Sequence, residues 1–430
     1  MNNLAQVLND TLIQENINVF NMLSTLGKEL YYPKGILTQS AEAKEKATRF
    51  NATIGIATLN GESMHFQHIQ DTLSAYSPDE LYDYAPPSGK ESLRAEWKKK
   101  MLRENSSLKD KNISNPIVTG ALTHGLSIVA DLFVDEGDTV ILPDKYWGNY
   151  NLIFGIRRKA NIETYPLFDQ EGRFNIAGLS ESIAKQSKKA IVLLNFPNNP
   201  TGYTPNEEEA KGIVEAVKSA AKVGKEIVVL VDDAYYNLFY DDTAIKESIF
   251  SKLANVHDSV LCVKIDGATK ENYAWGFRVG FITYAAKSKK VLHVLEEKTK
   301  GIIRGTISSA PHPSQTFILK AMQSDCYEEE RELKLNIMKK RAAKVKEVLQ
   351  KPKFAEVWTP YPFNSGYFMC LRLNCVSAHD LRKSLLENRG IGTISINETD
   401  LRIAFSCVEE QDIEQLYDEI YQEIKIMQEK

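Results

Sequence analysis

The chain has 430 residues, 43% of them hydrophobic and 26% charged, with a formal net charge of −4. This composition is typical of a globular protein with two or three domains, and the charge gives no reason to expect nucleic acid or an anionic membrane as a partner. Five cysteines and seven histidines form neither a disulfide framework nor a metal-ligand spacing, so we expect no metal site. Without a signal-peptide pattern or an apolar run of membrane-spanning length, the sequence predicts a cytoplasmic protein.

From about residue 90, helical and strand-like segments alternate along the chain. Expected helices cover residues 90–103, 123–134 and 206–223, and expected strands cover residues 116–119, 139–142, 189–194, 226–231, 259–265 and 277–284. The runs at 189–194 and 226–231 are almost continuously apolar, which is typical of strands buried on both faces of a parallel sheet. The pattern predicts a three-layer α/β fold with a mostly parallel sheet.

The C-terminal third has a different pattern. Long charged helices are expected over residues 314–351, strands at 367–373 and 401–406, and a last helix at 409–427. This order predicts a second, smaller α+β domain. The first sixty or so residues do not share the alternation either. We therefore expect an N-terminal segment that packs with the small domain (1–65), a large α/β domain (66–312), and the C-terminal part of the small domain (313–430).

Polar segments follow five of the expected strands. They are GALTHG after residue 119, PDKYWGNY after 142, NFPNNPTG after 194, DDAYYNLFY after 231 and the loop with Lys270 after 265. Taken one at a time, each has an ordinary structural explanation as a turn, a helix cap, a core aromatic or a solvated lysine. In an open parallel sheet, however, ligands bind beyond the carboxyl ends of the strands, so these segments are expected to meet at one edge.

The side chains expected at this edge match what pyridoxal phosphate requires of a protein. Its aldehyde needs a lysine, its ring nitrogen needs a carboxylate, and its phosphate needs backbone N–H groups and an arginine. Three motifs then carry a family resemblance: NNPTG, Asp232-Asp-Ala-Tyr235, and Thr269-Lys270 followed by Arg278-Val-Gly. In order and spacing they resemble the class I/II aminotransferases of the aspartate aminotransferase family, which are fold-type I pyridoxal-phosphate enzymes. The resemblance runs from about residue 50 to the C-terminus.

The resemblance implies transfer of an amino group from an L-amino acid to a 2-oxo acid through a Schiff base on Lys270. Aspartate, glutamate and aromatic amino acids are the candidate donors. Lys270, Asp232 and Tyr235 would be catalytic, with Asp232 at the pyridinium nitrogen and Tyr235 and Asn199 at the ring 3-oxygen. The further cofactor-binding residues implied are Thr269 beside the lysine, Arg278 with Ala121, Leu122 and Thr123 at the phosphate, Trp147 (or, second to it, Tyr146) stacked on the ring, and Tyr84 and Ser308 at the phosphate of a partner subunit.

The same resemblance assigns the substrate carboxylates to two arginines. Arg402 matches the arginine that clamps the α-carboxylate through two hydrogen bonds, with Ile56, Ala57 and Asn199 close to the substrate. Arg304 resembles a partner-subunit arginine that holds the distal carboxylate of dicarboxylic substrates. A structural salt bridge at the subunit interface is the alternative role for Arg304. These assignments imply a homodimer whose active sites are shared.

Two features of the sequence depart from the family pattern. Gly267 stands where many relatives carry a hydroxyl residue, and Ala-Leu-Thr at 121–123 replaces a Ser-Gly-Thr or Gly-Gly-Lys type. We therefore expect more of the phosphate's hydrogen bonds to come from backbone N–H groups.

Three other functions are rivals to that of an aminotransferase. The nearest rival is a pyridoxal-phosphate lyase or decarboxylase on the same fold. A ligand-sensing regulator would need an added DNA-binding domain. A noncatalytic scaffold would leave the lysine, carboxylate and arginine set without a purpose.

Overall fold

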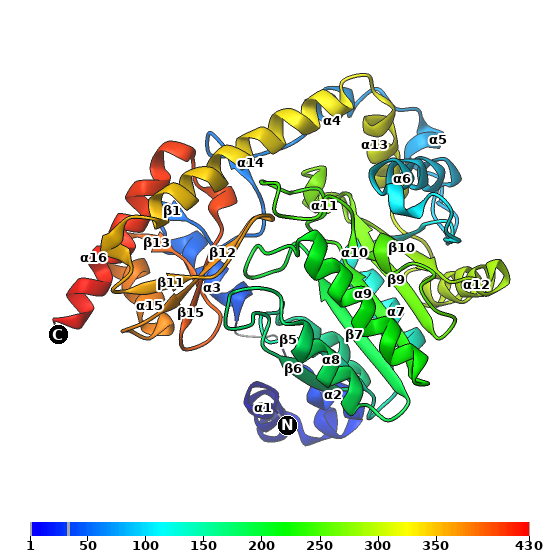
Figure 1. Cartoon of the computed structure of the whole chain (residues 1–430), viewed down its shortest axis with the longest axis horizontal. Helices are drawn as coiled ribbons and strands as arrows, with labels where there is room; N and C mark the ends of the chain where they lie inside the picture. Colours follow the sequence, from blue (N-terminus) through cyan, green and yellow to red (C-terminus); the bar gives the residue numbers. More distant parts are fainter. Residues whose placement is uncertain (1, 32–34, 430) are drawn as a thin grey trace.

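The computed structural model describes residues 2–31 and 35–429 and contains one large and one smaller β-sheet of several strands (Figure 1). The large sheet has the strand order β4-β10-β9-β8-β7-β5-β6. Its strands are β4 Ile117–Gly120, β5 Thr139–Pro143, β6 Asn161–Tyr165, β7 Lys189–Asn195, β8 Glu226–Asp232, β9 Val260–Gly267 and β10 Val279–Ala285. Only β10 runs antiparallel to its neighbours, so the other strands end at one common edge. The expected mostly parallel sheet is confirmed.

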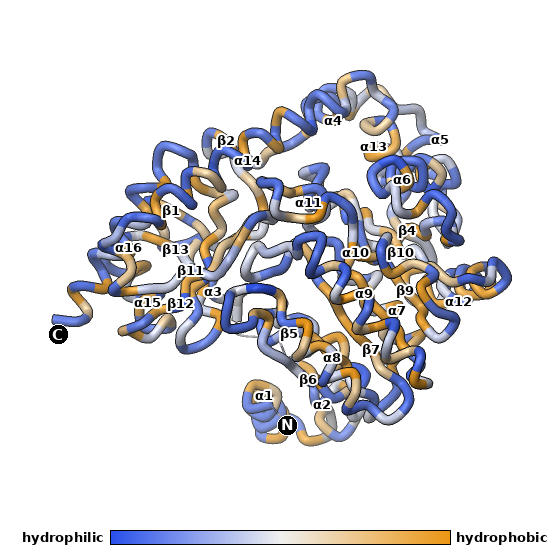
Figure 2. The backbone as a smooth tube through the Cα atoms, in the orientation of Figure 1, coloured by the Kyte–Doolittle hydropathy of each residue, from blue (hydrophilic) through white to orange (hydrophobic). Residues whose placement is uncertain are grey.

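The strands of the large sheet bury side chains on both faces, as their apolar runs predict. Along β7, Ala190, Val192 and Leu194 pack in one hydrophobic cluster with α8 (Ile176–Lys185) and α9 (Glu207–Lys222). Ile191 and Leu193 alternate with them and pack in a second cluster with α7 (Ala121–Phe133) and α12 (Lys289–Thr306). Figure 2 shows hydrophobic residues along the central strands and hydrophilic residues on the outer helix faces. The three-layer α/β architecture is therefore confirmed.

The smaller, C-terminal sheet is antiparallel, with the strand order β11-β12-β15-β14. Its strands are β11 Trp358–Pro360, β12 Met369–Leu373, β14 Ile394–Ser395 and β15 Asp400–Ile403. The helices α15 (Ala378–Arg389) and α16 (Ile413–Gln428) pack against each other beside it. In Figure 1 the long helix α14 (Tyr327–Leu349) runs from the large sheet's side of the molecule toward the small sheet. This part of the chain is the predicted second α+β unit.

Part of the N-terminal segment joins the small sheet's side of the molecule. Strand β1 (Phe50–Asn51) pairs in parallel with β13 (Ile391–Gly392), and Gln39 Nε2 donates to the Ser395 carbonyl at 3.1 Å. The helices α1 (Asn3–Met22) and α2 (Thr25–Glu29) lie apart from that sheet in Figure 1. Residues 1, 32–34 and 430, which fall within the predicted terminal segments, lie outside the described residues. The division at 65 and 312 stays a prediction.

The other elements connect these units. They are α3 Ile36–Lys46, the β2 (Thr58–Leu59) and β3 (Glu62–Ser63) hairpin, α4 Gln67–Thr72, α5 Pro78–Leu81, α6 Glu91–Glu104, α10 Ile249–Leu253, α11 Ala268–Glu271, α13 His312–Gln323, the π-helical turn η2 Asn151–Ile156, and the 3₁₀ turns η1 Ser106–Leu108, η3 Trp275–Phe277, η4 Pro352–Phe354, η5 Phe405–Cys407 and η6 Glu410–Asp412. Among the described helices, none is both long and apolar enough to cross a membrane.

Several predicted boundaries differ from the observed ones. The helix expected at 123–134 begins at Ala121, which turns out of β4 with φ of 66°. The strand expected at 277–284 begins at Val279, because Arg278 is left-handed (φ 56°) and cannot continue a strand. The strand expected at 401–406 ends at Ile403, where the chain turns into η5. The sequence interpretation did not identify β6, whose position at the sheet edge leaves it without a long apolar run.

Candidate active site

A cavity of about 310 Å³ opens where the large sheet's parallel strands end. Its lining comes from both sheets and from the loop after β1: Gly55, Ala121, Leu122, Thr123, Trp147, Tyr150, Asn195, Asn199, Asp232, Ala234, Tyr235, Thr269, Lys270, Arg278, Phe368 and Arg402. Segments that are far apart in sequence therefore meet here, because the strands they follow end at the same edge. Most of the residues named from the sequence line this one space.

Lys270 enters the cavity from α11, a single helical turn at the end of β9. Its Nζ lies 5.3 Å from the centre of the Tyr235 ring. Burial lowers the pKa of Lys270 to about 8, with Arg278 acting in the same direction and Asp232 opposing it. A lysine with this pKa is neutral in roughly a tenth of molecules at pH 7, far more often than an exposed lysine. The environment thus favours an amine that can react and exchange protons.

Asp232 is the last residue of β8, and only 3% of it is exposed. Its Oδ2 accepts a 2.6 Å hydrogen bond from the Tyr150 hydroxyl, and its Oδ1 accepts one from the Ala234 backbone at 3.1 Å. Burial raises the pKa of Asp232 to about 6, while these hydrogen bonds and Lys270 oppose the shift. A buried carboxylate of this kind gains a great deal from a protonated nitrogen beside it.

Asn195, the last residue of β7, and Asn199 in the loop after it connect this carboxylate to Arg402 on the other side of the cavity. Asn195 Nδ2 donates to the Asp232 carbonyl at 2.9 Å, and its Oδ1 accepts from the Asn199 backbone N–H at 2.9 Å. The side chain of Asn199 is thereby held over the cavity. Sequence reasoning named Asn199 but gave no role to Asn195 or to Tyr150, although both stand in the quoted strand-end segments NFPNNPTG and PDKYWGNY.

Arg402 faces Asn199 from β15 of the small sheet and is 2% exposed. Its Nη1 donates to Asn199 Oδ1 at 3.0 Å and its Nη2 to the Thr53 carbonyl at 2.8 Å. The guanidinium carbon lies 4.1 Å from the centre of the Phe368 ring. Arg402 Nε is buried without a hydrogen-bond partner in the described structure. Among the described residues, this guanidinium has no acidic partner and its Nε–H donates no hydrogen bond. It is therefore well suited to bind the carboxylate of a substrate.

The opposite end of the cavity is built for an anion. The α7 N-terminus opens into it through residues 121–123, and no side chain caps this helix end. Gly280 allows β10 to approach closely, since a Cβ there would lie 2.6 Å from the Ala121 carbonyl carbon. Thr269 Oγ1 is buried and has no hydrogen-bond partner among the described residues, and Arg278 also lines the cavity. Free helix N–H groups, a spare hydroxyl and a guanidinium together fit a phosphate.

The geometry explains the unusual glycine before the lysine. A Cβ on Gly267 would lie 2.5 Å from the Val279 carbonyl oxygen and 2.8 Å from Gly280 Cα. Real Cβ atoms do not approach backbone so closely, so no hydroxyl side chain fits at position 267 in this loop. The unpartnered Thr269 Oγ1 is the hydroxyl that this chain offers instead.

Five of the predicted residues lie outside the cavity of their own chain. Tyr84 is 93% exposed, and Arg304 on α12 donates to Ser308 Oγ on the surface. Ala57 is fully buried in the core, and the carbonyl of Ile56 accepts a hydrogen bond from Ser406 Oγ. Gly55, which the sequence interpretation did not name, is the member of this loop that lines the cavity. The roles predicted for Tyr84, Arg304 and Ser308 concern a second subunit and stay predictions.

Comparison with known proteins agrees with this geometry. The family model for aminotransferase class I and II matches residues 56–420. A protein named "Probable aspartate/prephenate aminotransferase" from Aquifex aeolicus is 26% identical over 62% of this chain and 65% of its own length. The aspartate aminotransferase of Geobacillus stearothermophilus is 25% identical over 62% of this chain and 64% of its own length. The chain thus matches slightly less than two thirds of each of these relatives.

Solved structures match over nearly the whole chain. An aminotransferase from Anaerococcus prevotii superposes with a TM-score of 0.82 at 25% identity, covering 93% of this chain and 98% of that one. The kynurenine aminotransferase of Pyrococcus horikoshii superposes with a TM-score of 0.79 at 18% identity, over 96% and 99% of the two chains. The second match shows a shared fold, and both cover the two sheets described above.

Proposed function

Because the chain belongs to the aminotransferase class I and II family, we propose that it is an aminotransferase that moves an amino group from an L-amino acid to a 2-oxo acid. Enzymes of this family use pyridoxal phosphate as their cofactor. One observation carries the proposal: Lys270 shares a single cavity with a buried carboxylate, Asp232, and a buried arginine, Arg402. These are the groups that attach the cofactor, support its ring and hold a substrate carboxylate.

The residues present fit the cofactor. The unpartnered Thr269 hydroxyl, the uncapped α7 N-terminus and Arg278 would hold its phosphate. Trp147 would lie on the ring face, and Asn199 and Tyr235 would donate to the ring 3-oxygen. When bound, the cofactor supplies an electron sink for negative charge that develops on the substrate α-carbon. Asp232, which is already ionised for most of the time at pH 7, would keep the ring nitrogen protonated through its opposite charge.

Lys270 has two proposed tasks that its environment supports. Its amine would attach covalently to the cofactor aldehyde, since a lowered pKa increases the neutral, nucleophilic form. Once it is released, Lys270 Nζ would be free to take the proton from the substrate α-carbon as a general base and to give it up again as a general acid. Arg402 would hold the α-carboxylate during this transfer, so that the α-carbon stays within reach of Nζ.

A homodimer with shared sites is part of the proposal. In one chain, the lining of the cavity contains three cations, Lys270, Arg278 and Arg402, and each already has a role. A second carboxylate on the substrate would therefore have no cation of its own among the described lining residues. The exposed position of Arg304 supports its reaching a neighbouring subunit's site, which would select aspartate or glutamate.

The experiment that tests the function is a half-reaction. We expect the purified yellow protein, mixed with aspartate, glutamate or an aromatic amino acid, to lose its yellow absorbance and release one equivalent of the matching 2-oxo acid. Adding a 2-oxo acid should restore the colour. Release of carbon dioxide or of an eliminated group without oxo acid would support the lyase or decarboxylase instead. An Arg304→Gln protein that keeps aromatic donors but loses aspartate and glutamate would assign the distal carboxylate to Arg304.

Substitution of Arg402 by lysine tests the carboxylate clamp. The lysine keeps the positive charge but cannot make two parallel hydrogen bonds, a loss of about 2–3 kcal/mol of binding to a charged group. We expect kcat/KM for the amino acid to fall by about 30- to 150-fold. The protein should still bind the cofactor and stay yellow, because the hydrogen bonds of Arg402 go to Asn199 and Thr53 and not to Lys270 or the residues 121–123 at the phosphate. Unchanged kcat/KM in a folded, yellow Arg402→Lys protein would contradict this role.

A further inference from the structure

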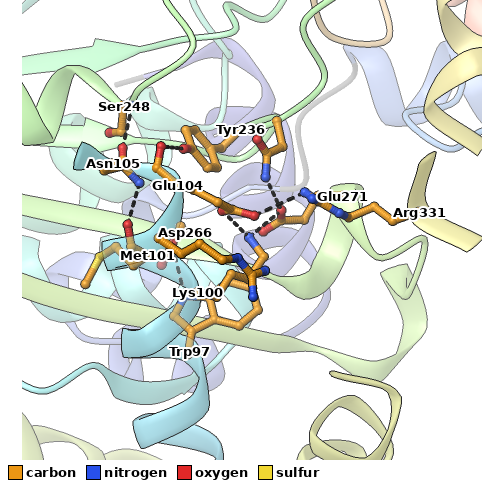
Figure 3. A network of polar contacts seen from close by, with 12 residues as sticks. Trp97, Lys100, Met101, Glu104, Asn105, Tyr236, Ser248, Asp266, Glu271 and Arg331 are labelled. Atoms are coloured by element: carbon orange, nitrogen blue, oxygen red, sulfur yellow. Dashed lines mark hydrogen bonds and ion pairs between the residues drawn. The ribbon is translucent and has the colours of Figure 1, made fainter. Parts of the chain in front are cut away.

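A cluster of buried charges surrounds Glu271, the residue that follows Lys270 in α11, and Figure 3 shows Glu271 together with Lys100, Glu104 and Arg331. We define the Glu271 cluster as Lys100 and Glu104 of α6, Asn237 of the loop after β8, Glu271 of α11 and Arg331 of α14. None of these residues is among those that line the cavity. The proposed chemistry therefore leaves this cluster without an explanation.

Lys100 stands at the centre of the cluster. Its Nζ lies 2.7 Å from Glu104 Oε2 and 2.8 Å from Glu271 Oε2, and its side chain is 4% exposed. Burial disfavours the ammonium, but Glu104 and Glu271 outweigh this effect and raise the pKa of Lys100. Glu104 also receives a hydrogen bond from Arg331 Nη1 at 3.1 Å. Lys100 is therefore a permanently charged anchor that two carboxylates share.

Glu271 connects Lys100 to the two turns that carry Lys270 and Tyr235. It follows Lys270 directly in α11, and the two side chains leave the turn in different directions, one toward the cavity and one toward Lys100. The same Glu271 Oε2 accepts a 3.2 Å hydrogen bond from Asn237 Nδ2. Asn237 has a left-handed φ of 69° and ends the turn at residues 234–237, which contains Tyr235 and closely follows Asp232 at the end of β8. The Glu271 carboxylate thus fixes the α11 turn, which carries Lys270, against the turn that carries Tyr235.

The α11 turn that carries Lys270 depends on contacts from other elements, because it is too short to be stable by itself. The helix α11 has only four residues, and no side chain caps its N-terminus. A helix of this length is unstable by its own hydrogen bonds, so contacts from outside must fix its orientation. The charge-assisted bond from Lys100 to Glu271 is one such contact, and the Tyr367 hydroxyl donates a neutral one to the Lys270 carbonyl at 2.9 Å.

We propose that Glu271 is the positioning residue for Lys270: its bonds to Lys100 and Asn237 hold α11 so that Lys270 Nζ faces the Tyr235 ring and Asp232. The inference rests on the proposed function for its catalytic consequence, although the contacts themselves do not. Glu104 provides a matched control, because it shares the same ammonium but makes no hydrogen bond to α11 within the described structure.

The test compares Glu271→Met with Glu104→Met in the full-length holoenzyme. Each substitution removes one carboxylate from Lys100 and replaces it with a side chain of similar length. Glu104→Met also removes the ion pair with Arg331, so it should lower the unfolding temperature at least as much as Glu271→Met. We expect kcat to fall about 10-fold in Glu271→Met, with KM for the amino acid within about twofold, because Arg402 is untouched. In Glu104→Met we expect both constants to stay within about twofold of the parent. Equal losses of kcat in the two proteins would overturn the proposal.

Amide hydrogen exchange gives a second readout that does not need turnover. Residues 268–272 should exchange about 10-fold faster in Glu271→Met than in the parent, and at the parent rate in Glu104→Met. Asn237→Gly provides a second variant in case Glu271→Met does not fold, because glycine tolerates the positive φ at this position. It should raise the exchange rate of residues 268–272 at least about threefold. Parent-like exchange in Asn237→Gly, or in a folded Glu271→Met, would refute the positioning role. A parent without transaminase activity would refute the proposed function alone.

Discussion

Replacing Lys270 with alanine is expected to lower kcat by at least about 10⁴-fold, because the substitution removes both the cofactor attachment and the proton carrier. Among the described lining residues there is no second lysine that could substitute for it. Steady-state assays of oxo-acid formation measure the loss. Visible absorbance gives an independent reading, since the yellow colour of the attached cofactor should disappear as well.

The fold should survive this substitution, which makes the result interpretable. Lys270 Nζ takes part in no salt bridge in the described structure, and its burial as an ammonium is costly, as its lowered pKa shows. We therefore expect cofactor-free Lys270→Ala to unfold at a temperature equal to or above that of the cofactor-free parent. A Lys270→Ala protein that keeps the yellow absorbance and turns over would exclude Lys270 as the catalytic amine.

Replacing Lys264 with methionine is expected to cause the largest loss of stability, about 3–5 kcal/mol in the free energy of unfolding. Lys264 lies on β9 with its side chain 1% exposed, forms an ion pair with Asp233, and lies 3.2 Å from Asp266 Oδ2. Without the ammonium, two buried carboxyl groups would face each other unpaired. Hydrogen bonds from Ser248 and Trp97 remain but do not carry a charge. Urea unfolding at neutral pH measures the difference.

The loss in Lys264→Met should depend on pH with a defined sign. Burial already raises the pKa of Asp233 in the parent, and removing the ammonium raises it further. A carboxyl whose folded pKa lies above its unfolded value loses stabilisation as the pH rises through the folded pKa. The variant should therefore be closer to the parent at pH 5 than at pH 8.

Lys189→Met is the matched control for this experiment. Lys189 begins β7 of the same sheet and pairs with Asp138 at 2.6 Å, but its side chain is 35% exposed. Solvent screens such a pair, so we expect a loss of at most about 1 kcal/mol. Equal destabilisation by the two substitutions would show that burial of the Lys264 pair has no special weight.

Much of the candidate site could be predicted because its residues follow the ends of strands. The apolar runs at 189–194 and 226–231 mark buried parallel strands, and the polar segments after them must meet at one edge. For this reason Asn199, Asp232 and Lys270 could be placed together from the sequence. Local sequence also carried the motifs that identify the family.

Other contributions depend on contacts that no local pattern encodes. Tyr150 reaches Asp232 across 82 positions of sequence, and Phe368 lies on Arg402 because two strands of a different sheet are neighbours. Gly267 appeared as a missing hydroxyl in the sequence, and its meaning emerged only from the closeness of the Val279 carbonyl. Packing distances of this kind are set by the whole fold.

The sequence by itself determined the fold class and the family and predicted which lysine is catalytic, because these depend on the order of strands and on short motifs at their ends. Only the tertiary structure decided how that lysine is held. Glu271, next to it in the chain, belongs to none of the motifs in the sequence, yet it is buried against Lys100 from α6 and Asn237 from the loop after β8. Such a contact exists only once distant segments have packed, since a buried charge takes its meaning from the partners that surround it.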